Sequence, residues 1–568
     1  MIELRCFMQV AVVCMMATGL VAPRVCTQAH ASPPPDSAVS LVRKKPSIFF
    51  YHDGRHPLIY MYEPPIHKEQ FEAAIDELAG TPVEALMFCL GDGRTVLHDT
   101  KIGELWGNHI ERWPHLIFRR AHQNARKLIA EGNDPLRIIC ERAHKKGMLI
   151  YPSLIVNQPT GERGTDVRTS LFRLNNPQLE IGAGGGVSPE FRGFRNLDFK
   201  HREVRDERMA LIKETLSRYQ VDGFELQLDL WPYYFRPDEV DTGRGILTAW
   251  IEDVHRAVNE SGPNRELVVR VPANLEACEA VGLDVREWIR RGMVDVVIGM
   301  NYVIPGIMDQ TLDLRPLVAE AKGSKTRVLA DFDTEVDSDR MADSTTEMVR
   351  AAACNYWAQE VDGFLLDGWF HYWPYDASFY EKLRELPHPD VLASKDKSYF
   401  IPTAVRRKRS KQIDVGPNLQ LPRDLTAKQP VTIQWTVSDD LMRWQKVGRV
   451  HKVLLRIRLT NAVETDRVQF KLNGKQLPES SLRKINNVYK MRAPRYRVFG
   501  YWYVFTLDEE HWPVQGTNSL EVALKHRDAD IVPHLAVRDV ELNIKYLMGK
   551  NFHRTDDVEL GPSESRSY

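Results

Sequence analysis

The 568-residue chain is too long to fold around one hydrophobic core, so two or more domains are expected. Its composition, 43% hydrophobic and 27% charged, is typical of globular proteins and excludes a largely disordered chain. The formal net charge of −1 gives no overall attraction to nucleic acid or to an anionic membrane, and we expect no nucleic-acid partner.

Residues 1–31 differ in composition from the rest of the chain. The apolar run "FMQVAVVCMMATGLVA" (Phe7–Ala22) follows Arg5, and Ala29 and Ala31 supply the small residues of a cleavage site. This pattern predicts a signal peptide over 1–31, followed by a Pro/Ser-rich spacer over 32–46. An uncleaved anchor is the alternative, because the start of the chain is poor in positive charge. No later stretch is long and apolar enough to span a bilayer, so we expect a periplasmic or secreted protein without stable membrane insertion.

The four cysteines beyond the leader are widely spaced, and each lies in an apolar segment. They are interpreted as buried thiols, because a disulfide framework is typical of smaller and denser chains. No CxxC motif or His/Cys cluster indicates zinc, and we expect neither a metal nor another cofactor. The four residues are Cys89, Cys140, Cys278 and Cys354.

Strand-like and helix-like patterns alternate from residue 47 to residue 388. Eight such repeats favour a (β/α)8 TIM barrel, an α/β fold, over an open sheet. No GxGxxG or GxxxxGK[ST] motif follows any strand, which argues against a nucleotide-binding sheet. The predicted strands are Ser47–Gly54, Glu84–Arg94, Met148–Gln158, Gly223–Leu230, Glu266–Asn274, Val294–Tyr302, Thr326–Asp333 and Val361–Phe370.

Beyond Pro387 the pattern changes to short strands with period-two alternation and no good helix between them. We predict an all-β sandwich, jelly-roll-like, over 413–549, with a β-hairpin turn at Asn473–Gly474. A basic linker over 389–412 precedes it, and a polar tail over 550–568 follows it. The run "RRKRSK" (Arg406–Lys411) is interpreted as a solvated part of this linker, with contact to a polyanion as the alternative.

The fourth predicted strand carries acid, amide and acid at alternate positions. Glu225, Gln227 and Asp229 share one phase, while the other phase is apolar and suits packing against helices. The polar phase therefore points into the barrel and climbs toward the C-terminal mouth, where catalytic groups of this fold lie. By contrast, Asp222 and Asp362 precede their strands at the far end and are interpreted as turn or cap residues.

The ends of the other strands add polar and aromatic side chains to the same mouth. Carboxylates, amides and flat rings together are typical of a sugar site, because rings stack on pyranose faces and polar groups bind hydroxyls. Beside Gln227 and Asp229, the predicted substrate-binding residues are His52, Tyr233, Arg270, Asn274, Asn301, Tyr302 and Trp369.

Glycoside hydrolysis needs a protonated acid and a second carboxylate that acts as nucleophile or base. Glu225 is the first candidate for the acid, because apolar neighbours would raise its pKa. Asp331 or Asp333 is the candidate partner, with Asp367 next. For each acid, a structural ion pair with a residue such as Arg270 or Arg327 is the alternative.

The segment from Asn196 to Phe235 resembles bacterial glycoside hydrolase-like barrels of the glycosyl-hydrolase-like family 10 group. The resemblance lies in a Leu-Asp pair, "EVR", a helix, "VDG" at the start of the strand pattern (V)DGxxxD of the family, and an aromatic-rich turn with proline. It implies a (β/α)8 barrel that acts on a polysaccharide. Relatives commonly carry Asp at the position of Gln227, and glutamine can be neither a general acid nor a nucleophile. The C-terminal sandwich looks like galactose-binding-like accessory domains.

The favoured function is therefore hydrolysis of O-glycosidic bonds in a polysaccharide or oligosaccharide by a carboxylate pair. The alternative is a non-catalytic polysaccharide-binding protein on a decayed hydrolase scaffold, for which Gln227 is the reason. A third hypothesis is a metal-dependent barrel hydrolase. The strands lack a His/Asp ligand set, which leaves a Mg²⁺ or Ca²⁺ site of Asp331, Asp333 and Asp367.

Overall fold

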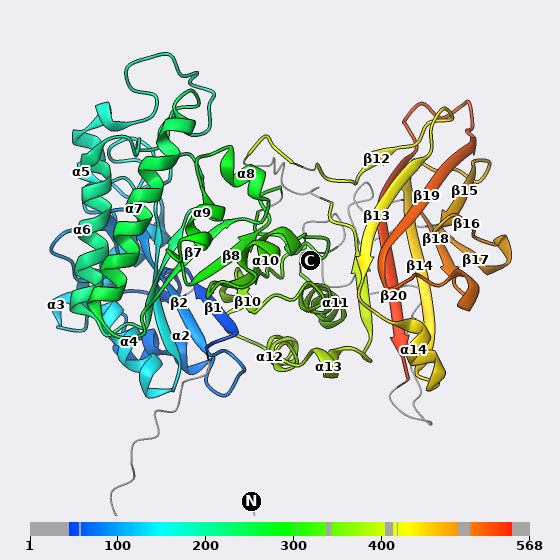
Figure 1. Cartoon of the computed structure of the whole chain (residues 1–568), viewed down its shortest axis with the longest axis horizontal. Helices are drawn as coiled ribbons and strands as arrows, with labels where there is room; N and C mark the ends of the chain where they lie inside the picture. Colours follow the sequence, from blue (N-terminus) through cyan, green and yellow to red (C-terminus); the bar gives the residue numbers. More distant parts are fainter. Residues whose placement is uncertain are drawn as a thin grey trace, which may run out of the picture. The chain divides into compact units, whose positions relative to one another are not determined.

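The computed structural model describes residues 45–55, 58–303, 305–336, 341, 343–403, 413–416, 418–486 and 500–547 (Figure 1). The predicted signal peptide, the spacer up to residue 44, the basic run and the polar tail lie outside the described residues. The elements below belong to the compact unit that begins at Pro46. No helix in the described ranges is both long and apolar enough to cross a membrane.

Eight parallel strands form a closed barrel, which confirms the predicted fold. Each strand pairs with the next along the chain, and β1 pairs with both β2 and β10, which closes the ring. The strands are β1 (Ile48–His52), β2 (Ala85–Asp92), β5 (Leu149–Ile155), β6 (Gly223–Gln227), β7 (Glu266–Pro272), β8 (Val296–Met300), β9 (Arg327–Asp331) and β10 (Gly363–Leu366). The short strands β3 (Thr95–Val96) and β4 (Glu104–Leu105) extend the sheet beyond β2.

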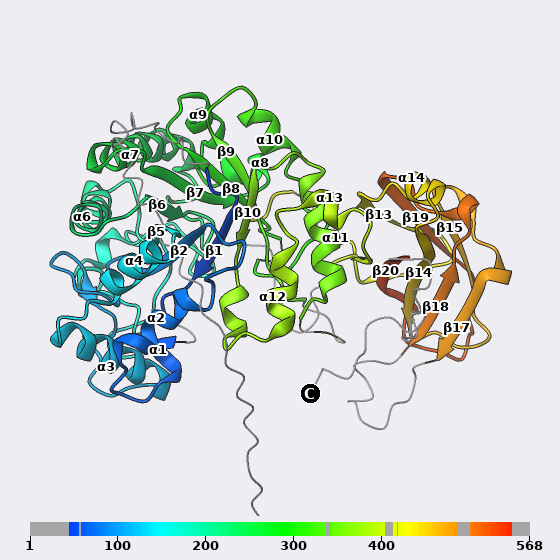
Figure 2. The same ribbon diagram turned by 90° about the horizontal axis from the view of Figure 1, so that it is seen from below.

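Helices follow the strands and surround the barrel (Figures 1 and 2). The helices cover the outer face of the sheet, and the inner face lines the closed barrel, so every barrel-strand residue except Arg327 is buried. The longer helices are α2 (Lys68–Asp76), α3 (Leu116–Ala130), α4 (Pro135–Lys145), α6 (Arg202–Arg218), α7 (Val240–Ser261), α9 (Val285–Arg290), α10 (Arg315–Ala321), α11 (Thr346–Trp357) and α12 (Ala377–Arg384). The shorter ones are α1 (Leu58–Met61), α5 (Leu171–Asn175), α8 (Leu275–Glu279) and α13 (Pro389–Leu392).

At the N-terminal edge of the barrel, carboxylates accept hydrogen bonds from the backbone of neighbouring strands. Asp222 accepts a hydrogen bond from Ile150 N on β5 at 2.9 Å, and Asp362 accepts one from Val328 N on β9 at 2.8 Å. These contacts confirm the predicted capping role of both aspartates. Asp295 and Glu84 make the same kind of contact with the backbone N–H groups of Leu267 and Ser47.

The C-terminal region is a pair of antiparallel sheets, as predicted. One sheet has the order β11-β20-β14-β18-β17, with β12 beside β20, and the other has the order β13-β19-β15-β16. Their strands are β11 (Lys397–Phe400), β12 (Arg423–Asp424), β13 (Val431–Val437), β14 (Val450–Thr460), β15 (Arg467–Leu472), β16 (Lys475–Gln476), β17 (Leu482–Asn486), β18 (Tyr501–Thr506), β19 (Gly516–His526) and β20 (Ala536–Tyr546). Asn473 and Gly474 have φ angles of 51° and 81°, which confirms the predicted hairpin turn between β15 and β16.

The predicted linker over 389–412 contains regular structure that the sequence analysis missed. Its residues form α13 and then β11, which pairs with β20 as a strand of the sandwich. Lys397 is 1% exposed, and its Nζ donates to Asp439 Oδ1 at 2.9 Å. This buried ion pair lets a sequence with a lysine form a buried strand at the edge of the sheet. The short helix α14 (Leu441–Lys446) was not predicted either.

Side chains of the barrel bind the sandwich backbone at several points. The side-chain amide of Gln310 donates to Ser398 O at 3.0 Å and accepts from Phe400 N at 2.8 Å. Asn355 on α11 donates to Thr436 O at 2.9 Å. The amide groups thus satisfy backbone atoms that these contacts bury.

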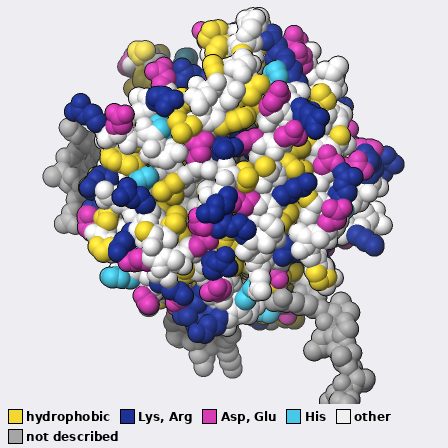
Figure 3. Space-filling view, turned by 90° about the vertical axis from the view of Figure 1, so that its left-hand side faces the viewer, with side chains coloured by type: hydrophobic (Ala, Val, Ile, Leu, Met, Phe, Trp, Pro, Cys, Tyr) yellow, Lys and Arg dark blue, Asp and Glu magenta, His cyan; other side chains and the backbone are white. Residues whose placement is uncertain are grey.

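The four described cysteines are buried free thiols, as predicted. Burial raises the pKa of the Cys89 thiol to about 11, which keeps it protonated at neutral pH. On the face of the molecule in Figure 3, Lys and Arg side chains alternate with Asp and Glu, in keeping with the near-zero net charge.

Candidate active site

The polar residues of β6 lie inside the barrel, as the alternation of the strand predicts. Glu225 is 0% exposed, and its Oε1 accepts a hydrogen bond from Arg270 Nε on β7 at 2.8 Å. Burial raises the pKa of Glu225, in the predicted direction, while the Arg270 guanidinium lowers it. The carboxylate is therefore a buried partner of Arg270 within the strand layer.

Arg270 connects this position with the opposite side of the barrel. Its Nη1 donates to Asp367 Oδ2 at 3.1 Å, directly after β10, and its guanidinium lies 4.6 Å from the ring centroid of Tyr51 on β1. Three elements that are far apart in the chain therefore share one buried cation. Without these partners, burial of the guanidinium would be costly.

Gln227 on β6 connects the neighbouring strand β5 with β1, which lies beyond β2 in the ring. Its side-chain nitrogen donates to Tyr51 Oη at 3.1 Å and to Ser153 Oγ on β5 at 2.7 Å. Both amide N–H groups are therefore used within the barrel wall, and the side chain is 3% exposed. Tyr51 and Ser153 were not predicted as site residues. Their signal was the inward phase of their strands, but neither type of side chain indicates catalysis by itself.

Three aspartates at the C-terminal ends of the strands hold protons readily. Burial raises the pKa of Asp229 to about 7. Burial, followed by the nearby Asp367 carboxylate, raises the pKa of Asp333 to about 8 and that of Asp331 well above its usual range. Among the described carboxylates of this site, Glu225 Oε2, Asp229 Oδ1 and Asp331 Oδ1 are buried without a hydrogen-bond partner. These oxygens are acceptors that the described fold leaves unused.

Asp367 is the most accessible carboxylate of this cluster, with 22% of its side chain exposed. Its Oδ2 accepts from Arg270, and its Oδ1 accepts from Gly368 N at 2.9 Å. Gly368 has a φ of 74°, and a Cβ atom at this position would lie 2.8 Å from Asp333 Oδ1. Glycine at 368 therefore allows the carboxylates of Asp333 and Asp367 to share this corner of the mouth.

Several predicted substrate-binding residues have their polar atoms bound within the fold. Asn274 caps α8, accepting from Ala277 N at 2.7 Å, and Asn301 donates to Asp309 Oδ2 at 2.8 Å. Tyr302 is 3% exposed and donates to Val415 O at 2.6 Å. These contacts stabilise loops and the chain segment 413–416. The polar groups that make them are used within the fold.

The predicted aromatic and histidine residues of the substrate site differ in how far they are buried. Trp369 is buried, and its indole N–H donates to Phe332 O at 2.7 Å. His52 is buried, stacks on Phe88 and accepts from Gly54 N at 3.0 Å through Nδ1. Tyr233 is partly buried and contacts Phe191 edge-on. Of these three, only Tyr233 retains an accessible side chain.

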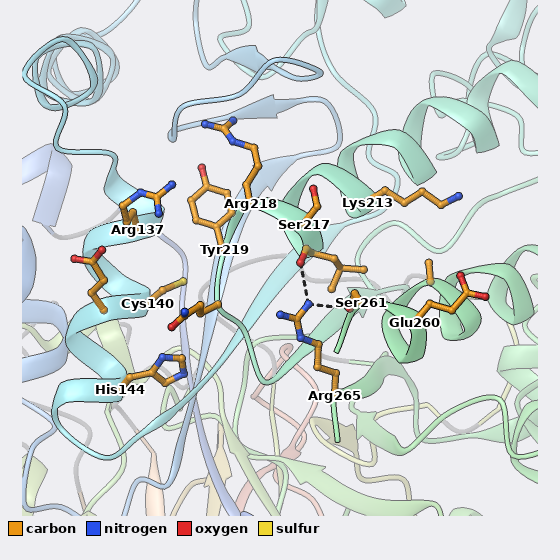
Figure 4. Close-up of a pocket in the computed structure, with 14 residues that line it drawn as sticks. Arg137, Cys140, His144, Lys213, Ser217, Arg218, Tyr219, Glu260, Ser261 and Arg265 are labelled. Carbon is orange, nitrogen blue, oxygen red and sulfur yellow. Dashed lines mark hydrogen bonds between the residues drawn. The ribbon is translucent and has the colours of Figure 1, made fainter. Parts of the chain in front are cut away.

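A cleft of about 770 Å³ lies between α4, α6 and α7 (Figure 4). Two of its lining residues, Gln220 and Arg265, come just before β6 and β7, so the cleft is at the N-terminal end of the barrel. Arg265 donates to Leu216 O and to Ser261 Oγ, both at 2.8 Å. The guanidinium thus binds the C-terminal turns of two helices, and the acids described above lie at the other end of the strands.

Within the described residues, no group of three or more His, Cys, Asp or Glu side chains is arranged to hold a metal ion. The aspartate trio considered in the sequence analysis is therefore not assembled as a set of ligands. The arrangement present is a group of acids around one buried arginine, which suits proton transfer to or from a carboxyl group.

Comparison with known proteins finds no matching family model and no matching curated protein. Among solved structures, α-L-fucosidase isoenzyme 2 from Paenibacillus thiaminolyticus is 11% identical with a TM-score of 0.41, and the match covers 62% of this chain and 51% of the fucosidase. The glycoside hydrolase domain of PgaB (BpsB) from Bordetella bronchiseptica is 13% identical, with a TM-score of 0.36 and coverage of 61% and 97%. A class V chitinase from Pseudomonas fluorescens Pf-5 is 13% identical, with a TM-score of 0.35 and coverage of 60% and 100%.

The match spans about half of the fucosidase chain. At these identities and TM-scores the comparisons carry no argument about activity. The closed barrel of this protein follows from its own strand pairing. Any activity has to be argued from the residues at the mouth.

Proposed function

We propose that this protein is a glycoside hydrolase that cleaves O-glycosidic bonds of a polysaccharide, in keeping with its resemblance to the glycosyl-hydrolase-like family 10 group. The observation that carries the proposal is the pair formed by Asp229 and Asp367 at the C-terminal mouth. Asp229 has a raised pKa and an oxygen without a partner, and Asp367 is the accessible carboxylate that Arg270 contacts. Two carboxyl groups in different environments are the requirement of this reaction.

In this mechanism Asp229 is the general acid. A pKa of about 7 leaves much of the group protonated at neutral pH, and its proton passes to the glycosidic oxygen as the bond to the sugar breaks. Asp367 either attacks the sugar carbon, after which water hydrolyses the glycosyl ester, or takes a proton from a water molecule that attacks this carbon. Arg270 holds Asp367 in place. Asp331 and Asp333, with their raised pKa values, donate hydrogen bonds to sugar hydroxyls. Glu225, the first candidate from the sequence, positions Arg270.

The test is reducing-sugar release by the mature protein from a panel of soluble β-glucan, xylan, galactomannan and chitosan. We expect Asp229→Asn and Asp367→Asn to lower release by about a hundredfold or more on the polymer that is cleaved. Asp241→Asn is the matched control, because its side chain is 96% exposed on α7. Release that persists in both mouth variants would reject this carboxylate pair.

The second candidate function is non-catalytic binding of a polysaccharide. It is favoured by Gln227, which occupies the position where the resembling family commonly carries Asp, and whose amide is bound inside the barrel wall. Retention of the wild-type protein on one polymer of the panel, without release of reducing ends, would support this function. We further propose export, and N-terminal sequencing that finds residue 32 first would support cleavage after Ala31.

A further inference from the structure

Trp231 differs from all the other tryptophans of the chain in its packing. The chain has 12 tryptophans, and all of them lie within the described residues. The other tryptophans belong to a hydrophobic cluster or pack against one: Trp106, Trp113, Trp250, Trp288, Trp357, Trp369 and Trp373 in the barrel, and Trp435, Trp444, Trp502 and Trp512 in the sandwich. Trp231 is partly buried but belongs to none of these sets. Its indole therefore lies outside the hydrophobic clusters of the described residues and is partly exposed.

The backbone of Trp231 is held in an unfavourable conformation. Its φ of 54° lies in the left-handed region, which a large L-residue rarely adopts, and the following residue is Pro232, which normally favours an extended neighbour. Trp231 O accepts hydrogen bonds from Asn196 Nδ2 at 3.1 Å and from Tyr233 N at 2.7 Å. Asn196 is 0% exposed and also donates to Tyr233 O at 3.0 Å. The surrounding chain thus fixes this turn.

The strained turn lies at the mouth of the barrel. Trp231 follows Asp229 by two residues, on the loop between β6 and α7, at the C-terminal end of the strand. Strain that the surrounding structure maintains is typical of ligand clamps and active sites. The partly exposed indole has flat apolar faces, and such faces stack on the C–H faces of pyranose rings.

We infer that Trp231 is a stacking platform for a pyranose ring at the C-terminal mouth, two residues along the chain from Asp229. The inference rests on the proposed function in one respect, since it takes the ligand to be a saccharide, but it does not require hydrolysis. The left-handed backbone at Trp231 turns the chain after β6, and the Asn196 contact maintains this orientation before a ligand arrives. The platform is therefore preorganised.

The experiment measures binding and hydrolysis of the same four polysaccharides by the wild-type protein and by Trp231→Ala, Trp231→Phe and Trp231→Gly. Trp444→Phe is the control, because this indole packs against the sandwich cluster. We expect Trp231→Ala to raise Kd and KM by about tenfold or more, Trp231→Phe to retain most of the affinity, and the control to bind like the wild type.

Trp231→Gly separates the role in binding from a role in folding. Glycine accepts a φ of 54° without strain, so we expect the Tm of this variant to equal or exceed that of the wild type while saccharide binding is lost. A lower Tm in Trp231→Gly would show that the indole packs in the folded protein and would overturn the inference. Wild-type Kd and KM in Trp231→Ala would overturn it as well.

The outcomes also separate this inference from the proposed function. If the wild type binds a polymer without cleaving it, and Trp231→Ala does not bind, the platform stands and hydrolysis fails. If the wild type cleaves a polymer and Trp231→Ala has an unchanged KM, the platform fails and hydrolysis stands. If the wild type neither binds nor cleaves any of the four polymers, both are overturned.

Discussion

Arg270 is the residue on which the charges of the barrel interior depend. It lies on β7, and its guanidinium reaches Glu225 on the neighbouring strand and Asp367 three strands away in the ring. A buried ion pair adds little net stability, but removal of one partner leaves an uncompensated charge. The main effect of Arg270 is therefore to neutralise the carboxylates of Glu225 and Asp367, and its contribution to net stability is small.

Replacement of Arg270 by methionine tests this dependence. We expect the free energy of unfolding to fall by about 3–5 kcal/mol, because Glu225 is left as a buried carboxylate without its partner. Glu225→Gln in the same chain should recover part of this loss but none of the activity, since Asp367 still lacks its contact. Urea unfolding at pH 7 measures both effects. Equal stability of Arg270→Met and the wild type would contradict the argument.

The raised pKa of Asp333 predicts a pH dependence of stability. The folded protein keeps this proton up to about pH 8, whereas the ordinary pKa of the group is 3.8. Between these values the folded state binds more protons than the unfolded state, so the free energy of unfolding falls as pH rises through this window. Asp333→Asn removes the effect. Its stability relative to the wild type should rise from pH 5 to pH 8, by about 1.4 kcal/mol per pH unit at most.

Urea unfolding at each pH unit checks this prediction. Asp241→Asn, an exposed substitution, should show no such trend relative to the wild type. Parallel curves for Asp333→Asn and the wild type would mean that the carboxyl group is ionised in the folded protein across the whole range.

At the scale of elements, the turn after β10 places two carboxylates in one corner. Gly368 has a φ of 74°, and a Cβ atom there would meet Asp333 Oδ1 at 2.8 Å. Gly368→Ala should therefore lower the free energy of unfolding by about 1–3 kcal/mol and reduce activity, because Asp333 has to move. Gly323→Ala is the matched control, since Gly323 has a φ of 83° and nothing within 4 Å of the added atom.

The difference between these two glycine variants in thermal unfolding isolates the contact with Asp333 from the strain of the backbone. A smaller loss in Gly368→Ala than in Gly323→Ala would show that the carboxylates do not need this space.

The elements that the sequence predicted are those in which burial and period agree. Barrel strands such as Val296–Met300 are continuous apolar runs, and the polar phase of β6 follows from alternation alone. β11 was missed because Lys397 resembles a solvated residue until Asp439 is placed beside it. The site was predicted only in part, because contacts between residues that are distant in the chain are not visible in the sequence. The chain order locates Asp229 and Asp367 at strand ends, but the contact of Arg270 with both walls exists only in three dimensions.

At the scale of the whole molecule, the sandwich begins earlier in the chain than its composition indicates. Asp439 accepts hydrogen bonds from Lys397 and from Tyr399, both on β11. A fragment of residues 395–549 should therefore fold, whereas a fragment of residues 413–549 lacks β11 and leaves Asp439 without these two donors. Amide proton NMR dispersion and gel filtration distinguish the two results. Equal folding of both fragments would show that β11 is dispensable.

The carboxylates at the N-terminal edge of the barrel have a consequence for how such a protein diverges. Side chains such as Asp222 and Asp362 hold neighbouring strands in register without help from the loops at the opposite edge. Those loops are thus released from maintaining the barrel, and their sequences can drift or be exchanged while the strands stay at the same height. Sequence similarity between related barrels is then expected to persist longer at the N-terminal edge of the strands than in the loops at the C-terminal edge. A barrel built in this way can acquire a new specificity, or lose an old one, while the fold stays unchanged.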